Sequence, residues 1–374
     1  MAGEIQPIVM PKWGLAMEEG VVTAWNVAEG ATITKGQEIA DIETSKIANV
    51  FESPVAGTLR KLVAQTGETL PVGALLAVVA DKSVGDAELD AYIAKFNEAL
   101  MAALAAKASE KKAEPETVEI AGGRKIRYLK LGNTDGPPIV FVHGFGGDLN
   151  NWLFNQEALA EHHTAYAIDL PGHGGSTKDV GAGDLASMTA ALAAWMDALK
   201  IARAHLVGHS MGGAVSLQLA AAKPDMVASA TLICPGGLGP DIAMDYINGF
   251  IEASRGKKLE PVLQMLVANP ALVTRDMIED VLKFKRIDGV DAALKKMRDA
   301  LFPGGRQADA LRDSLGKVKA PVQVIVGAQD RVIPSAHATG LPGNVKVHVI
   351  ETAGHMPHME ASSEVNRLID EIAG

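Results

Sequence analysis

The sequence predicts two folded parts in series, a small all-β domain followed by a larger domain of the α/β class. Three observations lead to this prediction. Residues 5–80 read as short apolar strands broken by Gly, Pro and Asn, with no convincing helix. From Thr117 onward, short apolar strands alternate with helical stretches rich in Ala and Leu, which is typical of a mostly parallel sheet. Between them the composition changes to Ala, Lys and Glu. The expected boundaries are 1–80, 81–116 and 117–374.

Length and composition limit the function. The chain has 374 residues, of which 48% are hydrophobic and 21% charged, an ordinary globular composition. The net charge of −10 and the lack of a basic cluster argue against nucleic acid or an anionic membrane as a partner. Cys234 is the only cysteine, which favours a reducing compartment. Met1–Glu4 does not resemble a signal peptide, and no apolar run reaches about 18 residues. We expect a soluble cytoplasmic protein.

The first domain contains an internal repeat. Gly30, Gly36, Ile39, Ala40 and Ile42 recur as Gly67, Gly73, Leu76, Ala77 and Val79, each pair about 37 positions apart. Two such halves predict two small sheets in a flattened sandwich, with glycines at turns that need a positive φ. Lys46 lies in the connection after Ile42, where a turn would present its long side chain to solvent.

Residues 5–80 resemble a lipoyl domain. The resemblance rests on Met10-Pro11-Lys12, on Gly14-Leu15, on Gly30, Gly36 and Gly57, and above all on Glu43-Thr44-Ser45-Lys46, which matches the lipoylation motif. The related biotin-carrying fold usually has Met on both sides of its lysine, whereas here the neighbours are Ser45 and Ile47. The resemblance therefore implies lipoate attached to Lys46. The alternative is an unmodified lysine in a solvated turn.

The connector contains one predicted helix. Asp86 is a candidate N-cap. Apolar residues then follow helical spacing at Leu89, Ile93, Phe96, Leu100 and Leu104. This helix is either a docking element for another subunit, or a helix packed on the α/β domain or acting as a semi-rigid spacer. The segment 107–116 reads as a solvated linker.

The larger domain begins with a predicted hairpin over 118–131, turning at Gly122-Gly123. Short apolar strands are expected at Ile139–Val142, Ala165–Ile168, His205–Val207, Ala230–Ile233, Val322–Val326 and Val345–Ile350. Helices lie between them. Residues 236–310 are helical and apolar in part, and we expect them to form a cap over a pocket.

A serine at a sharp turn is the main catalytic candidate. Gly208-His209-Ser210-Met211-Gly212 fits the G-x-S-x-G pattern, with a strand before it and a helix after it. A serine hydroxyl is a poor nucleophile without a base, and the base needs an acid to orient it. Asp330 and His355 each follow a predicted strand and are the best candidates for acid and base.

Residues 117–374 resemble the α/β-hydrolases. The chain order Ser210, Asp330, His355 is that of the family. His143-Gly144-Phe145-Gly146 follows the third strand, so the resemblance implies an oxyanion hole made by the backbone amides of Phe145 and Met211. Asp169-Leu170-Pro171-Gly172-His173-Gly174-Gly175-Ser176 matches a structural loop of the family and lacks the Lys-Ser/Thr of a phosphate-binding loop.

Other readings of these residues stay open at this level. His358 is a second candidate for the base, and Asp169 a second candidate for the acid. His355 and His358 as metal ligands are disfavoured because Pro357 disrupts a helical i, i+3 face and no partner ligands are evident. We therefore expect no metal. Ser210 could also belong to an inactive elbow.

A lipoyl domain joined to an α/β-hydrolase domain resembles the dihydrolipoamide acyltransferase component of acetoin dehydrogenase complexes. The His-x-x-x-Asp-Gly motif of ordinary 2-oxo acid dehydrogenase acyltransferases is not found. The resemblance implies that a thiamine-diphosphate-dependent partner cleaves acetoin and acetylates the lipoyl group on Lys46. Ser210, activated by His355, would pass the acetyl group to coenzyme A. A dihydrolipoyl dehydrogenase would reoxidise the lipoyl group, and a lipoylating enzyme would attach it.

Several alternatives to this mechanism remain. No residue marks a coenzyme A site, and direct attack by a thiol would need Ser210 only as a polar helper. The same triad could instead hydrolyse a thioester, an ester or a carbon–carbon bond. A third class is a carrier, in which the lipoyl domain works and the α/β domain is a scaffold. The oligomeric state is also open, a homo-oligomer included.

Overall fold

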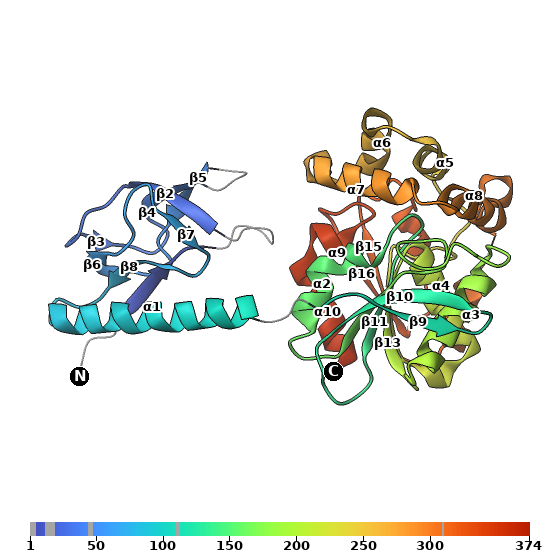
Figure 1. The fold of residues 1–374 in the computed structure, drawn as a ribbon, viewed down its shortest axis with the longest axis horizontal. Helices are drawn as coiled ribbons and strands as arrows, with labels where there is room; N and C mark the ends of the chain where they lie inside the picture. Colours follow the sequence, from blue (N-terminus) through green and yellow to red (C-terminus); the bar gives the residue numbers. More distant parts are fainter. Residues whose placement is uncertain (1–4, 12–18, 44–47, 110–112, 309) are drawn as a thin grey trace. The chain divides into compact units, whose positions relative to one another are not determined.

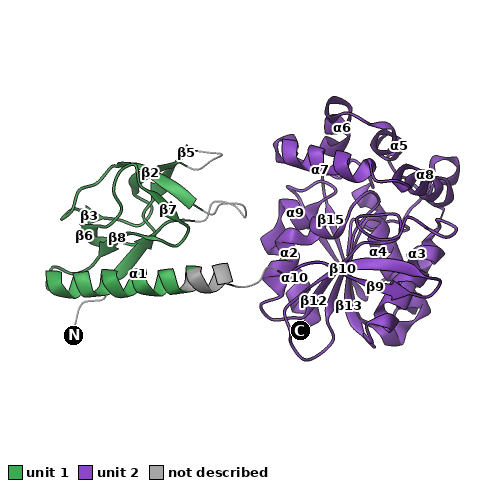
Figure 2. Ribbon diagram, in the orientation of Figure 1, with its two compact units in different colours: residues 1–112 green, residues 113–374 purple. Residues whose placement is uncertain are grey.

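A computed structural model describes residues 5–11, 19–43, 48–109, 113–308 and 310–374. The chain divides into two compact units, Met1–Lys112 and Ala113–Gly374, coloured separately in Figure 2. The division falls between the end of helix α1 (Asp86–Ser109) and the start of strand β9 (Glu116–Ile120). Each unit is described by itself below.

The first unit is a sandwich of two four-stranded antiparallel sheets. One sheet has the order β1 (Gln6–Val9), β8 (Leu75–Val79), β6 (Gly57–Leu62), β3 (Thr32–Ile33). The other has the order β5 (Ala48–Glu52), β4 (Glu38–Glu43), β2 (Glu19–Trp25), β7 (Thr69–Pro71). The repeated segments β4 and β8 occupy the same place in their sheets. The predicted two-sheet sandwich is therefore confirmed.

The repeat extends to backbone conformation and burial. The four repeated turn glycines, Gly30, Gly36, Gly67 and Gly73, have φ angles of 85°, 82°, 86° and 85°. L side chains rarely adopt this region, so glycine is favoured at each turn. Ile39 and Ile42, with their counterparts Leu76 and Val79, are buried in the core between the sheets. The duplicated sequence thus specifies two equivalent halves.

Helix α1 packs on the sandwich. Its Leu89 is buried with Leu75 and Val78 of β8, and Ile93 and Phe96 lie against the same cluster. The apolar side that we expected to face another subunit or the α/β domain therefore covers the first unit's own sheet. Asp86 is the first helical residue rather than a cap, and its carboxylate forms an exposed ion pair with Arg60 at 3.2 Å.

The second unit is an eight-stranded sheet in the order β16, β15, β14, β13, β11, β12, β10, β9 (Figure 1). Strands β9 and β10 form the predicted hairpin and β10 pairs antiparallel with β12, whereas the remaining pairs are parallel. The other strand bounds are β10 (Arg124–Leu131), β11 (Ile139–Val142), β12 (Ala165–Ile168), β13 (Ala204–His209), β14 (Val227–Ile233), β15 (Val322–Gly327) and β16 (Val345–Ile350). The α/β class is confirmed.

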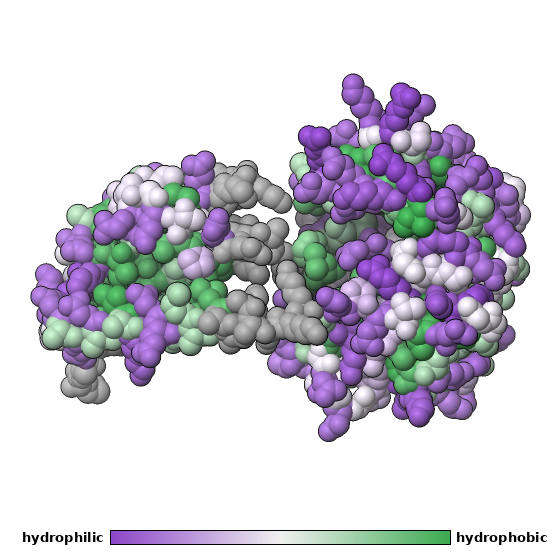
Figure 3. Space-filling model, in the orientation of Figure 1, coloured by the Kyte–Doolittle hydropathy of each residue, from purple (hydrophilic) through white to green (hydrophobic). Residues whose placement is uncertain are grey.

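Helices cover both faces of this sheet. Their bounds are α2 (Leu153–Leu159), α3 (Leu185–Ala198), α4 (Met211–Ala222), α9 (Pro357–Glu360) and α10 (Ser362–Ala373). Strand β11 shows the alternation expected of a strand buried on both sides. Val140 and Val142 join the apolar cluster that includes α3 and α4, whereas Ile139 and Phe141 join the one that includes α2 and α10. On the face drawn in Figure 3, the surface of this unit is mostly hydrophilic, with hydrophobic side chains in small separate patches.

Four helices between β14 and β15 form a cap. They are α5 (Met244–Glu252), α6 (Gly256–Leu263), α7 (Arg275–Lys285) and α8 (Val290–Leu301), gathered at the top of the unit in Figure 1. Short 3-10 turns complete the unit at Leu149–Trp152, Pro224–Met226, Gln264–Leu266, Pro270–Leu272, Pro303–Gly305, Arg312–Lys317 and Ser335–Ala338. Across the described part of the chain, no helix has both the length and the apolar character needed to span a membrane.

Candidate active site

Ser210 occupies a strained turn between β13 and α4. Its φ of 52° and ψ of −116° lie in a region that a residue with a side chain rarely adopts, at a cost of about 1–3 kcal/mol. Hydrogen bonds hold the turn, because the Ser210 amide donates to the Ile233 carbonyl and the Gly236 amide donates to the Ser210 carbonyl, both at 2.9 Å. A Cβ on Gly212 would lie only 2.1 Å from the Val142 carbonyl oxygen. A residue without a side chain is therefore required at Gly212, where α4 passes close to β11.

Asp330 and His355 meet across two loops at the ends of neighbouring strands. Nδ1 of His355 donates to Oδ2 of Asp330 at 2.7 Å, and the two side chains are only 2% and 1% exposed. Oδ1 of Asp330 accepts from the amides of Val332 and Ile333 at 2.8 and 2.9 Å. Burial alone would raise the pKa of Asp330, but His355 and these two amides outweigh burial and hold that pKa below its ordinary value. The carboxylate is thus kept ionised and fixed in orientation.

Ser210 and His355 line the same cavity, but no hydrogen bond joins the Ser210 hydroxyl to the His355 ring. Hydrogen bonds between nucleophile and base are often long without substrate and tighten only in the reacting complex. The backbone of His355 is tied on both sides. Its amide donates to the Leu266 carbonyl at 2.8 Å, and its carbonyl accepts from Nε2 of His209, the residue before Ser210, at 2.8 Å. His209 thereby links the serine turn to the histidine loop.

The two predicted oxyanion-hole amides are available. Met211 is the first residue of α4, and the first amides of a helix have no partner within it. Phe145 lies in the loop after β11, and no described group accepts a hydrogen bond from its amide. The helix dipole of α4 adds a partial positive charge at this end. Both amides are therefore free to donate to an oxyanion formed beside Ser210.

Two buried histidines hold the loop that carries Phe145. Nδ1 of His143 donates to the Gly144 carbonyl at 2.7 Å, and Nε2 of His173 accepts from the Gly146 amide at 3.1 Å. The rings of the two histidines lie 4.7 Å apart. Burial lowers the pKa of both histidines, and the pKa of His173 lies well below its ordinary value. Both rings therefore stay neutral. A neutral His173 is needed here because a protonated ring has no lone pair to accept with.

The rival candidates for base and acid have other surroundings. Both ring nitrogens of His358 are buried without a hydrogen-bond partner among the described residues. Its ring lies 4.6 Å from the ring of Trp152 and 4.6 Å from that of His209. Burial lowers the pKa of His358 to about 3. Asp169 binds the Leu149 and Gly175 amides at 2.8 and 2.7 Å and pairs with Arg127 at 3.2 Å, as expected of a structural loop.

Sequence reasoning did not assign roles to His173 and His209, although both lie inside quoted motifs. Their partners are a backbone amide and a backbone carbonyl from distant segments. Nothing in the residue types signals such contacts. The only signal in the sequence was that each histidine directly follows a glycine inside its motif.

Cys234, Asp330 and His355 place three potential metal-ligand atoms within 4.8 Å of one another. The Asp330 carboxylate is already taken by His355 and two amides. Burial, followed by the nearby Asp330 charge, raises the pKa of the Cys234 thiol well above its ordinary value, so the thiol stays protonated. These donors suit a triad rather than a metal ion, which needs deprotonated sulfur and free carboxylate oxygens.

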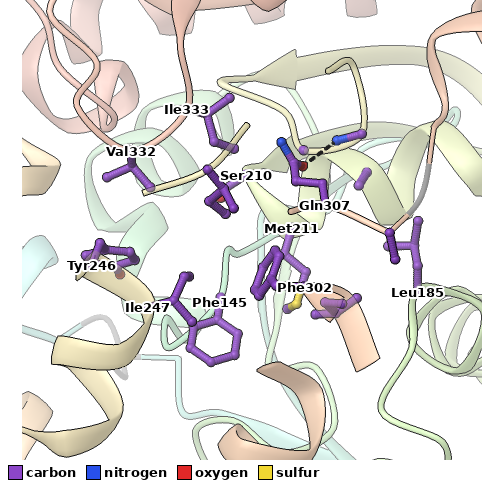
Figure 4. A pocket seen from close by; sticks show the side chains of 16 residues that line it. Phe145, Leu185, Ser210, Met211, Tyr246, Ile247, Phe302, Gln307, Val332 and Ile333 are labelled. Atoms are coloured by element: carbon purple, nitrogen blue, oxygen red, sulfur yellow. Dashed lines mark hydrogen bonds between the residues drawn. The ribbon is translucent and has the colours of Figure 1, made fainter. Parts of the chain in front are cut away.

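Two cavities adjoin Ser210. The Met211-side cavity encloses about 500 Å³ of space, solvent opening included, and is lined by Met211, Ala214, Ile247, Phe302 and Ile333 among others (Figure 4). The His355-side cavity encloses about 660 Å³ and lies between His355, the loop 144–147 and the cap residues Leu263, Met277 and Val281. Both cavities share Phe145, Ser210 and Tyr246 in their walls. The serine thus lies between two largely apolar cavities, and the base lines only one of them.

Lys46 lies outside the described residues. The strands that flank it are described, and Glu43 at the end of β4 pairs with Ala48 at the start of β5.

Comparisons with known proteins agree with both units. Residues 6–79 match the family model described as biotin-requiring enzyme, and residues 137–362 match the model described as alpha/beta hydrolase fold. A meta-cleavage product hydrolase from Pseudomonas fluorescens IP01 has a TM-score of 0.62 at 23% identity, covering 69% of this chain and 96% of its own. An enol-lactonase from Burkholderia xenovorans LB400 has a TM-score of 0.58 at 22% identity, covering 69% of this chain and 99% of its own. These two likenesses establish the fold alone.

Two relatives match along nearly the whole chain. Both are called dihydrolipoyllysine-residue acetyltransferase component of acetoin cleaving system. The Pseudomonas putida protein is 48% identical over 364 residues, which is 97% of each chain. The Cupriavidus necator protein is 44% identical over 378 residues and covers 100% of both chains. With a lipoyl domain followed by an α/β-hydrolase domain, the chain belongs to the family of dihydrolipoyllysine-residue acetyltransferase components of acetoin cleaving systems.

Proposed function

We propose that this chain moves an acetyl group from a thioester on the dihydrolipoyl group of Lys46 to coenzyme A, with Ser210 as the nucleophile. The observation that carries the proposal is the buried hydrogen bond of 2.7 Å between His355 and Asp330, in the wall of a cavity that also contains Ser210. The same chain carries its own lipoyl domain. A lone hydrolase domain would not need one.

In the first half-reaction, the Ser210 hydroxyl gives its proton to Nε2 of His355 and attacks the thioester carbonyl carbon. The amides of Phe145 and Met211 stabilise the oxyanion, and Asp330 stabilises the charged His355 ring. The carbon–sulfur bond then breaks, and the sulfur leaves as a thiol with the proton from His355. An acetyl ester on Ser210 remains.

In the second half-reaction, the thiol of coenzyme A gives its proton to His355 and attacks the ester carbonyl in the same oxyanion hole. The bond to Oγ of Ser210 breaks, and Oγ recovers its proton from His355. The products are acetyl-coenzyme A and free enzyme. Each thioester bond broken is balanced by one formed, so no oxidant or energy source is needed for transfer.

The lipoyl group, when attached, supplies a long arm that carries the acyl group as a thioester. Lys46 suits the attachment because the strands on either side of it are paired. Tethering gives the acyl group an effective concentration of roughly millimolar at the active site if the span permits. The arm and the coenzyme A thiol would both approach on the His355 side, since both must exchange a proton with this residue.

A component of a cleaving system works with other components. We propose a thiamine-diphosphate-dependent enzyme that cleaves acetoin and loads the arm, and a dihydrolipoyl dehydrogenase that reoxidises it. A separate lipoylating enzyme would modify Lys46. These enzymes would meet the chain in the cytoplasm, and a homo-oligomer would multiply the arms within one complex.

The decisive experiment supplies the lipoylated full-length protein with S-acetyl-dihydrolipoamide and coenzyme A, and measures acetyl-coenzyme A against free acetate. Acetyl-coenzyme A should predominate, and Ser210→Ala should lower its rate by about three orders of magnitude or more. A mass increase of one acetyl group on the Ser210 peptide, without coenzyme A, would identify the ester intermediate.

Each alternative gives a different result in this assay. Free acetate formed regardless of coenzyme A would make the chain a tethered hydrolase. Full transfer by Ser210→Ala would make the α/β unit a scaffold for a carrier. Transfer that depends on Ser210 but never labels it would favour direct attack by the thiol.

A further inference from the structure

Ser210 lies between two largely apolar cavities, of which only the His355-side cavity contains the base. Acetyl transfer needs space for a thiol arm and a methyl group. We propose that the Met211-side cavity is an acyl-chain site and that the enzyme accepts acyl groups longer than acetyl, at least propionyl and butyryl. This inference rests on the proposed function of Ser210 as acyl acceptor.

Tetrahedral geometry assigns the cavities. In the intermediate, the carbonyl carbon carries Oγ of Ser210, the oxyanion, the sulfur and the acyl chain. The oxyanion points to the amides of Phe145 and Met211. The sulfur must lie near His355, which gives or takes its proton in both half-reactions, and hence on the side of the His355-side cavity. The remaining substituent, the acyl chain, is left for the Met211-side cavity.

The lining of the Met211-side cavity fits an alkyl chain. Apolar side chains form most of it, from α3, the cap and the loop after β15: Leu185, Ile242, Ile247, Leu301, Val332 and Ile333. Figure 4 shows Ile247, Phe302 and Ile333 around the space beside Ser210. The side chain of Gln307 is engaged elsewhere, because it accepts from the Gly237 amide at 2.7 Å and donates to the Asp241 carbonyl at 2.9 Å. No group in this wall serves as a base for a thiol.

The Met211-side cavity extends from Ser210 to the surface of the unit. The cavity encloses about 500 Å³ with its opening, and Ala308 in its wall is exposed to solvent. An apolar site does not disfavour longer acyl chains by its chemistry, because burying each added methylene group improves binding by about fourfold. An apolar site that extends to the surface is therefore expected to accept propionyl and butyryl.

The test uses the full-length protein with acetyl-, propionyl- and butyryl-coenzyme A as donors and dihydrolipoamide as acceptor, and measures kcat/KM for each. We expect butyryl to be transferred with a kcat/KM at least equal to that of acetyl. Ala214→Leu adds three carbons to the wall of the Met211-side cavity and should lower the butyryl-to-acetyl ratio at least tenfold. Ile242→Phe fills the same cavity and serves as the test variant if Ala214→Leu does not fold.

A matched variant fills the other cavity. Val281→Phe narrows the His355-side cavity and should lower both rates while leaving their ratio within about twofold. A wild-type butyryl rate below a hundredth of the acetyl rate would overturn the inference. So would a ratio that falls in Val281→Phe and not in the Met211-side variants. Failure to transfer any acyl group would instead overturn the proposed function, and the two results are therefore distinguishable.

Discussion

Asp330 accepts three hydrogen bonds, and together they fix the orientation of His355. The amides of Val332 and Ile333 hold one carboxylate oxygen, so the other is presented to Nδ1 of His355 at 2.7 Å. This contact sets the tautomer in which Nε2 is free to take the proton of Ser210. In the proposed mechanism, the role of Asp330 is therefore electrostatic and orienting rather than direct.

We predict that Asp330→Asn lowers kcat for acyl transfer by about 10³–10⁴ with little change in KM. The amide side chain keeps the shape but removes the charge that stabilises the protonated ring, and it favours the wrong tautomer. Steady-state kinetics with acetyl-coenzyme A and dihydrolipoamide measure the effect. Asp313→Asn, at an exposed site, is the control and should behave as wild type. A loss of less than tenfold in Asp330→Asn would remove Asp330 from the triad.

In the proposed mechanism, His173 positions the Phe145 amide, because its ring accepts a hydrogen bond from the neighbouring Gly146 amide. We predict that His173→Phe lowers kcat about 10–100-fold with a smaller effect on KM, since the oxyanion donor loses its position while the substrate cavity remains. His173→Gln keeps an acceptor and should recover most of kcat. Kinetics of both variants, with binding of an oxyanion-mimicking inhibitor, test this role. Equal kcat in the two variants would leave His173 with a packing role only.

At the scale of elements, the crossing of β11, β13 and α4 is too close for a side chain at Gly212. A Cβ there would lie 2.1 Å from the Val142 carbonyl oxygen, far inside normal contact. We predict that Gly212→Ala lowers the free energy of unfolding by about 1–3 kcal/mol and also lowers activity, because Met211 moves with the helix. Thermal unfolding measures the first effect and acyl transfer the second.

Gly316→Ala is the matched control for this prediction. Nothing lies within 4 Å of a Cβ at Gly316, and its φ is outside the region that favours glycine. Alanine there should keep or slightly raise stability, because it restricts the unfolded chain. Equal stabilities for the two variants would show that the β13–α4 crossing has more room than the geometry indicates.

Local patterns in the sequence predicted the elements well. The 37-residue repeat predicted the paired sheets of the first unit, and apolar strands between helices predicted the α/β sheet. The packing of α1 was not predictable, because its apolar spacing at Leu89, Ile93 and Phe96 indicates a buried face but not what buries it. The structure places that face on β8. Periodicity identifies an element's face, whereas the partner depends on the tertiary fold.

The candidate site, too, was predictable from the sequence only in part. Ser210, Asp330 and His355 were identified from motifs and chain order, and the structure brings Asp330 and His355 into contact. The supporting roles of His173 and His209 depend on backbone groups 27 and 146 positions away, which leave no trace in local sequence. The two cavities likewise arise from side chains of many segments, so the sequence predicted a pocket under the cap but not its division into two.

At the scale of the whole molecule, the α/β unit buries several neutral histidines. Burial lowers the pKa of His143, His173, His209 and His358, and each neighbouring histidine adds to the effect for the last three. In the unfolded chain these side chains have a pKa of about 6.5. Below that pH the unfolded state binds more protons than the folded state. Stability contributed by these groups is therefore present above about pH 6.5 and is lost as the pH falls.

We predict that the α/β unit loses on the order of 1 kcal/mol of stability for each of His173, His209 and His358 between pH 6.5 and 5.5, because the pKa of each lies well below its ordinary value. His358→Phe should reduce that loss by about a third, because phenylalanine binds no proton in either state. At pH 7.5 the same variant should be at least as stable as wild type. Both nitrogens of the His358 ring are buried without a partner in the described structure, whereas a phenyl ring leaves no polar atom unpaired. Calorimetric unfolding at several pH values measures both effects. His162→Gln, at an exposed position, should not change the pH dependence. A variant His358→Phe that is much less stable at pH 7.5, with an unchanged slope below pH 6.5, would mean that His358 is hydrated or charged in the folded protein.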